Sequence, residues 1–175
     1  YLKSFGNNEI RLGFTRVTKD GIRSLGGVFG TNAGGAKSIV LPEAFDQKAE
    51  EGTVTFSHNG EDSQIQFEYF ISLLNNRIGS VSFEDPFQGS LAFGAGTAPD
   101  QGVISRAPDN QYHLFSLTGG INLPKSTRIS GIMEYGLSVQ DEEFLPFSSG
   151  TGLDLLPRRT ADAKIQTLHF SLNAT

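Results

Sequence analysis

The sequence predicts an all-β protein, an antiparallel up-and-down meander of about seven to eight long strands that forms a segment of a large transmembrane β-barrel. Three observations predict this fold. Helix signals are nearly absent, apolar and polar residues alternate with a period of two over long runs, and short connections alternate with long ones. The one helix-like stretch, residues 42–51, is short and lies between two strand-like runs, so we interpret it as a loop.

Alternation is clearest in residues 63–74 and 127–140, where one set of alternate positions is apolar and the other is mostly polar. These two runs alternate over about 11 to 14 residues, whereas an average strand has about 5–6 residues. Weaker alternation occurs in five further segments. Together the strands are expected at about 8–17, 22–31, 53–58, 63–74, 111–123, 127–140 and 163–173.

The connections between these strands follow a rhythm. Tight turns are expected at 18–21, at 59–62, where Asn59-Gly60 favours a hairpin, and at 123–126. Long connections are expected at 32–52, 75–110 and 141–160. Because short and long connections alternate, all tight turns should lie at one end of the sheet and all long loops at the other.

A membrane barrel and a soluble β-sandwich both fit this rhythm. Strand length favours the barrel, since about 11 residues tilted near 45° rise roughly 25 Å, the height of an apolar barrel belt. Scarce charge also favours it, because a soluble sandwich would expose a charged face. The side chains expected to face lipid are Ile65, Phe67, Tyr69, Ile71, Ile129, Met133, Tyr135 and Leu137. Those expected to face the lumen and contact a partner there are Glu9, Arg11, Gln66, Glu68, Arg128 and Glu134.

Composition excludes several functions. The 175 residues carry a net charge of −5, which argues against a nucleic-acid partner, and the absence of cysteine excludes disulfides and covalent haem attachment within this chain. We expect no cofactor and no metal site. His58, His113 and His169 lie on three different expected strands and lack the sequence spacing of metal ligands. The acidic pairs lie in expected turns and loops. Of these, Asp141–Glu143 could hold Ca²⁺ through its carboxylate oxygens. The sequence contains no motif of a catalytic nucleophile, so we expect the chain not to be an enzyme.

The chain from Gln64 to about His169 resembles the decahaem-associated outer-membrane β-barrel family, of the MtrB/PioB type, and residues 1–52 resemble it only in style. The resemblance rests on the order and spacing of several segments rather than on one specific motif. These segments are Phe83-Glu84-Asp85-Pro86-Phe87, Ala107-Pro108-Asp109-Asn110-Gln111-Tyr112-His113, Ser116-Leu117-Thr118-Gly119-Gly120, 123–131, Tyr135-Gly136, 140–147, Leu156-Pro157-Arg158-Arg159 and 162–167.

This resemblance implies a bacterial outer-membrane barrel that sheathes a periplasmic multihaem c-type cytochrome and insulates it from lipid during electron transfer. Its implied partners are that cytochrome, an extracellular multihaem cytochrome and outer-membrane lipid, and the haem would belong to the cytochrome. We expect the chain to be an internal piece of such a barrel, because about seven strands cannot enclose a cytochrome. A general diffusion porin and, less favoured, a soluble β-sandwich binding module are the alternatives.

Overall fold

The computed structural model describes residues 1–29, 37–84, 101–145 and 158–175, and in these ranges the chain is built from β-strands connected by turns and loops. The strands are β1 (Leu2–Phe5), β2 (Asn8–Phe29), β3 (Lys37–Asn59), β4 (Ser63–Asn76), β5 (Ser80–Glu84), β6 (Gln101–Ser105), β7 (Asn110–Leu123), β8 (Thr127–Gln140) and β9 (Ala163–Ala174). Within the described ranges, no helix is long and apolar enough to cross a membrane.

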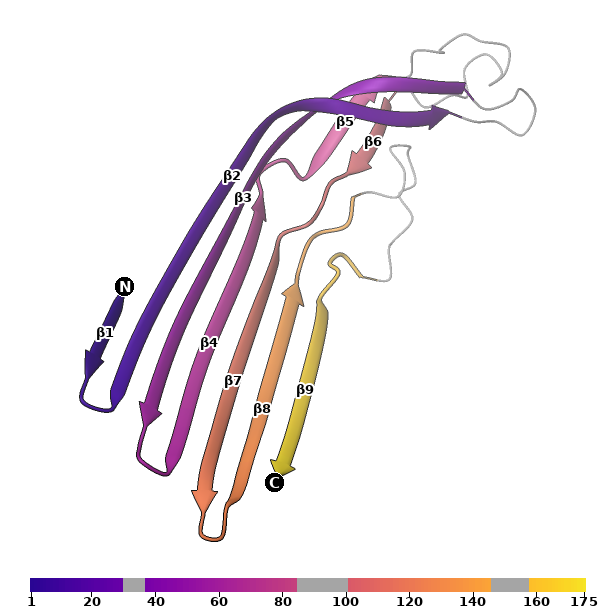
Figure 1. The fold of residues 1–175 in the computed structure, drawn as a ribbon. Coiled ribbons are helices and arrows are strands. Elements are labelled where there is room, and N and C mark those ends of the chain that lie inside the picture. Colours follow the sequence, from indigo (N-terminus) through magenta and orange to yellow (C-terminus); the bar gives the residue numbers. More distant parts are fainter. Residues whose placement is uncertain (30–36, 85–100, 146–157) are drawn as a thin grey trace.

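Seven strands form one antiparallel sheet in the order β1-β2-β3-β4-β7-β8-β9, which is their order along the chain (Figure 1). The predicted all-β, up-and-down meander is therefore confirmed. The sheet is open, with β1 and β9 at its two edges, as expected of a barrel segment. Strands β5 and β6 pair with each other in a separate two-stranded sheet.

The tight turns lie together at one end of this sheet (Figure 1). The turn after Asn59 and the turn after Leu123 connect β3 to β4 and β7 to β8, as predicted. A third tight turn connects β1 to β2 at Gly6, whose φ of 59° favours glycine. Strands β5 and β6, which follow β4 in the chain, lie at the opposite end.

The predicted turn at 18–21 is wrong, because β2 runs through it without interruption and pairs with β3 from Asn8–His58 to Phe29–Lys37. Gly21, with φ of 150°, lies opposite Phe45, and a side chain there would meet the Phe45 ring at 3.2 Å. The aromatic ring therefore packs over the glycine, and residues that look like a turn continue the strand.

The predicted long connection at 32–52 is also wrong from residue 37 onward, because 37–52 belongs to β3. The expected strands 8–17 and 22–31 are parts of β2, which ends at Phe29, and 53–58 is the end of β3. The helix-like stretch 42–51 is strand rather than loop. The predicted loop 75–110 contains β5 and β6, and Glu143 bridges to Thr160 within the predicted loop 141–160. Residues 30–36, 85–100 and 146–157 of these predicted segments lie outside the described residues.

The sheet is a single layer, and none of the large hydrophobic side chains in the described ranges is buried. A soluble β-sandwich would bury one face of this sheet against a second sheet. The structure therefore does not support the sandwich alternative, and both faces of the seven-stranded sheet are open to their surroundings.

Candidate functional site: the two faces of the sheet

The pairing register sorts the side chains of the seven-stranded sheet into two faces, since directly paired residues in an antiparallel sheet point to the same side. Across β4, β7, β8 and β9, Phe67 pairs with Leu117, Met133 and Phe170 in turn. One residue further along β4, Glu68 starts the row that continues through Ser116, Glu134 and His169. We call the face with Phe67 the apolar face and the face with Glu68 the polar face.

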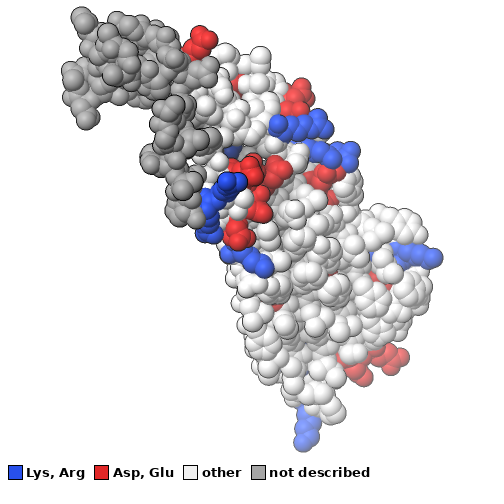
Figure 2. Space-filling model, turned by 180° about the vertical axis from the view of Figure 1, so that it is seen from behind, with Lys and Arg blue, Asp and Glu red and all other residues white. Residues whose placement is uncertain are grey.

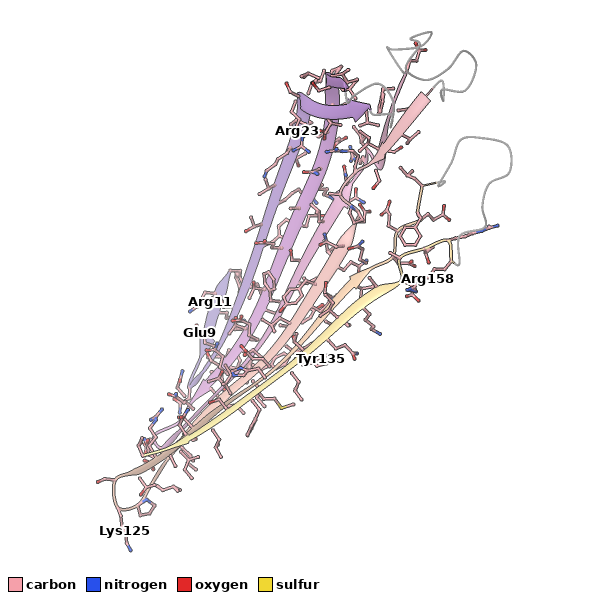
Figure 3. All side chains as sticks on the ribbon, turned by 90° about the vertical axis from the view of Figure 1, so that its right-hand side faces the viewer. Glu9, Arg11, Arg23, Lys125, Tyr135 and Arg158 are labelled. Carbon is pink, nitrogen blue, oxygen red and sulfur yellow. The ribbon has the colours of Figure 1, made fainter. Side chains whose placement is uncertain are left out.

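The two predicted sets of site residues fall on opposite faces of the sheet. The register places the eight residues predicted to face lipid, Ile65, Phe67, Tyr69, Ile71, Ile129, Met133, Tyr135 and Leu137, on the apolar face. It places the six predicted lumen residues, Glu9, Arg11, Gln66, Glu68, Arg128 and Glu134, on the polar face. Figure 3 shows Tyr135 on one side of the sheet and Glu9 and Arg11 on the other.

Large hydrophobic side chains on the apolar face are exposed along the whole sheet. Met133 is 49% exposed, and Phe170 on the neighbouring strand is 68% exposed. In β8 the apolar positions run from Ile129 to Val139, which is roughly 33 Å along the strand or about 23 Å at a tilt near 45°. This height matches the apolar belt of an outer-membrane barrel.

An aromatic row crosses the apolar face just above the middle of this belt, with Tyr135 two residues beyond Met133 on β8. The Tyr69 and Phe115 rings lie 4.8 Å apart, and the Phe115 and Tyr135 rings lie 6.5 Å apart. The Tyr69 hydroxyl is hydrogen-bonded to His113 Nδ1 at 2.8 Å, and the Tyr135 hydroxyl accepts from the Gln166 amide at 3.0 Å. The two tyrosines at the ends of this row therefore carry hydrogen-bonded hydroxyl groups and leave neither hydroxyl unsatisfied on the apolar face.

Charged side chains follow on the same face beyond the aromatic row. Arg16 and Glu50 are paired across β2 and β3, and the Arg16 Nε and Nη2 atoms donate to the Glu50 carboxylate at 2.9 and 2.6 Å. Lys48 Nζ lies 2.7 Å from the same carboxylate. Figure 2 shows that charge on this side gathers toward the end opposite the tight turns and leaves a broad uncharged area below it. The transition marks one boundary of the belt.

The lower part of the apolar face carries a shallow groove of about 410 Å³. Gly119 and Gly131 are paired across β7 and β8, and both line the groove, together with Ile65, Ile121 and Leu172. Because glycine has no side chain, the paired glycines leave the backbone open to whatever covers this face.

The lower part of the polar face is a hydrogen-bonded wall. Glu134 accepts from the Ser116 hydroxyl at 3.5 Å and lies 3.1 Å from His169 Nδ1. Toward the other edge, Thr55 donates to Glu68 at 3.3 Å. Further pairs are Arg11 with Glu9 at 3.0 Å and Arg128 with Asn122 at 2.9 Å. These bonds satisfy polar groups across several strands and suit a hydrated or protein-filled lumen.

The upper part of the polar face carries an apolar patch that the alternation of the sequence does not reveal. Phe70, Leu74, Tyr112 and Leu114 form this inner patch, and all four are half-buried. The Phe70 and Tyr112 rings lie 6.3 Å apart. Phe70 was already visible among polar positions of 63–74, but only the register brings it next to Leu114.

The three histidines, for which we expect no role as metal ligands, lie apart from one another. His58 is hydrogen-bonded to Asn8 Oδ1 at 2.8 Å, His113 to Tyr69, and His169 to Glu134. Glu142 accepts from the Asp109 amide at 3.2 Å. Among the residues that the structure describes, no three His, Cys, Asp or Glu side chains gather as metal ligands would.

Comparison with known proteins agrees with this geometry. The family model described as "Putative outer membrane beta-barrel porin, MtrB/PioB" matches residues 3–175. A curated relative, "Outer membrane protein MtrB" of Shewanella baltica (strain OS185), is 26% identical over 159 residues, which cover 91% of this chain and 21% of that protein. The chain thus spans about a fifth of the length of this relative. The chain therefore belongs to the MtrB/PioB family of β-barrels of the bacterial outer membrane.

Proposed function

We propose that this chain forms part of the wall of an outer-membrane barrel that encloses a periplasmic multihaem c-type cytochrome and insulates it from lipid. In this proposal the apolar face contacts lipid, the polar face contacts the cytochrome, and the wall has no enzymatic activity. The chain has no cysteine for haem attachment, so it would hold no cofactor and the electrons would pass through the haems of the partner. The end with long connections would face the exterior, where an extracellular multihaem cytochrome would dock.

The inner patch is the observation that carries this proposal. A water-filled pore needs a hydrated wall, whereas Phe70, Leu74, Tyr112 and Leu114 offer contiguous apolar surface on the lumen side. A protein inside the barrel would cover this surface and would also hydrogen-bond to the Glu68 and Glu134 rows below it. One wall would then contribute both apolar and polar contacts to the same partner.

Haem retention in the purified full-length protein tests the proposal. The unmutated barrel should copurify with covalent haem, and Leu114→Glu should greatly reduce the haem per barrel because it places a charge in the inner patch. Thr118→Glu is the matched control, since Thr118 lies on the same strand and face outside the patch. We expect it to retain most of the haem.

A general diffusion porin is the second candidate, favoured by the description of the family as a putative porin and by the polar rows of the lower wall. Conductance in planar bilayers separates the two functions. A sheath filled by its cytochrome should pass little current. A barrel that purifies without haem and conducts ions freely would refute the sheath and leave the porin.

A further inference from the structure

Strands β2 and β3 extend beyond the rest of the sheet as a two-stranded ribbon. The last pair between β3 and β4 is Gln47–Asn76, but β2 and β3 remain paired from Asp20–Asp46 to Phe29–Lys37, roughly 30 Å further. Figure 1 shows this ribbon bending across the ends of the other strands, in front of β5 and β6. An isolated two-stranded ribbon is marginally stable in water, so additional contacts must fix its direction.

A buried carboxylate lies between the ribbon and the β5–β6 hairpin. Glu43 of β3 is 1% exposed and is the one fully buried charged side chain in the described ranges. Its carboxylate accepts from Arg23 Nε at 3.1 Å and Nη2 at 2.8 Å, across the ribbon from β2. It also pairs with Arg106, which follows β6 directly and is itself only 12% exposed.

The two arginines have different structural roles. Arg23 belongs to the same ribbon as Glu43, and its guanidinium also stacks on Phe45, with Cζ 5.6 Å from the ring centre. Arg106 belongs to the other hairpin, where its amide donates to the Gly79 carbonyl at 2.9 Å. Removing one partner of a buried ion pair leaves charge without full compensation. Loss of Arg106 therefore breaks the link between the hairpins, whereas loss of Arg23 leaves it in place.

We propose that Glu43 and Arg106 form a latch that holds the β2–β3 ribbon against the β5–β6 hairpin as a fixed arch over the mouth of the barrel. Glu43 and Arg23 belong to the polar face, and Figure 3 shows the ribbon displaced from β5 and β6 in the direction in which Glu9 and Arg11 point. The position over the mouth rests on the proposed function, which makes the polar face the lumen wall. The latch itself rests only on the ion pairs.

Distance measurement between the two hairpins tests the latch. Spin labels at Val40→Cys and Val103→Cys, both exposed positions, are placed in the full-length barrel after removal of any other cysteines. We expect a narrow distance distribution in the unmutated background and a broad one with Arg106→Gln. Arg23→Gln and Arg77→Gln are the matched controls, since the first leaves Arg106 on Glu43 and the second removes only the exposed ion pair to Asp46. Both should keep the narrow distribution.

Thiol labelling tests the position of the arch. In the full-length barrel produced without its cytochrome, an impermeant maleimide added from the exterior should label Ser116→Cys on the polar face roughly tenfold faster when Arg106→Gln is also present. The arch opens when the buried pair is lost. Heat-modified gel mobility checks that each variant has folded. If Arg106→Gln does not fold, Arg106→Lys replaces it. Lysine lacks the forked guanidinium of arginine, so the distribution of distances between the spin labels should still broaden.

The outcomes separate the latch from the proposed function. A distribution that stays narrow in the Arg106 variant overturns the latch. A broad distribution with unchanged labelling of Ser116→Cys overturns the arch over the mouth. If only membrane-soluble reagents label Ser116→Cys in the otherwise unmutated barrel, the polar face does not line the lumen and the proposed function fails. The distance measurement still tests the latch in that case.

Discussion

The two faces of this sheet are built by the same strands but differ in how their polar groups are used. On the apolar face, polar atoms occur mainly in the upper half of the belt, where the Tyr69 hydroxyl bonds His113, and at its upper limit, where Glu50 binds Arg16. On the polar face, hydrogen-bonded groups such as Glu134 with His169 occur at the middle of the same strands. The difference indicates that the apolar face is adapted to a solvent that cannot hydrogen-bond, whereas the polar face is not.

The largest expected effect comes from a charge in the middle of the belt. Met133→Arg should destabilise the full-length barrel by about 2–4 kcal/mol, because it places a cation on the lipid side near the membrane midplane. Urea unfolding in lipid vesicles, followed by heat-modified gel mobility, measures this cost. The neighbouring residue Ile132 lies on the polar face, so Ile132→Arg should cost less than about 1 kcal/mol. Equal costs at the two positions would remove the distinction between the faces.

A smaller effect is expected at the aromatic row. Tyr69→Phe deletes the hydroxyl bonded to His113 and should cost about 1–2 kcal/mol, because the half-buried imidazole loses its partner within the belt. Tyr135→Phe deletes a hydroxyl whose partner, Gln166, is exposed, and should cost only a few tenths of a kcal/mol. The same unfolding experiment compares the two. A greater loss of unfolding free energy for Tyr135→Phe than for Tyr69→Phe would contradict this order.

The smallest effect on stability is expected on the polar face. Glu134→Gln weakens the contacts with Ser116 and His169, but both contacts are reachable by water, so the unfolding free energy should fall by less than about 1 kcal/mol. The change should be visible instead in how much cytochrome remains bound, measured as haem per barrel. A loss of several kcal/mol without loss of haem would make Glu134 a structural residue and not a contact residue.

Sequence periodicity predicted the body of the sheet because its physical cause is local. In 63–74 and 127–140 one side of each strand meets an apolar environment, so alternation is visible without knowing the neighbours. The faces of Glu68 and Met133 follow directly from the alternation.

The ribbon and the inner patch could not be predicted in this way, because pairing between distant segments decides them. Asp20-Gly21 resembles a turn, but Phe45 covers Gly21 from the opposite strand. Pro42 and the acidic residues after it favour a helix start, yet they pair with β2 over the whole ribbon. Pro42 is tolerated because β4 does not pair with that part of β3. Similarly, Glu43 has no local signal that it binds Arg106.

An accessibility scan along β8 tests the central claim most directly. Single spin labels at each position from Ile129 to Val139 in the full-length barrel are measured for collision with oxygen, which is concentrated in lipid, and with a water-soluble nickel complex. We expect high oxygen accessibility at Ile129, Met133, Tyr135 and Leu137, and low values at Ser130, Ile132 and Glu134, with a period of two. Equal accessibility on both faces, or oxygen maxima at Ile132 and Glu134, would contradict this expectation.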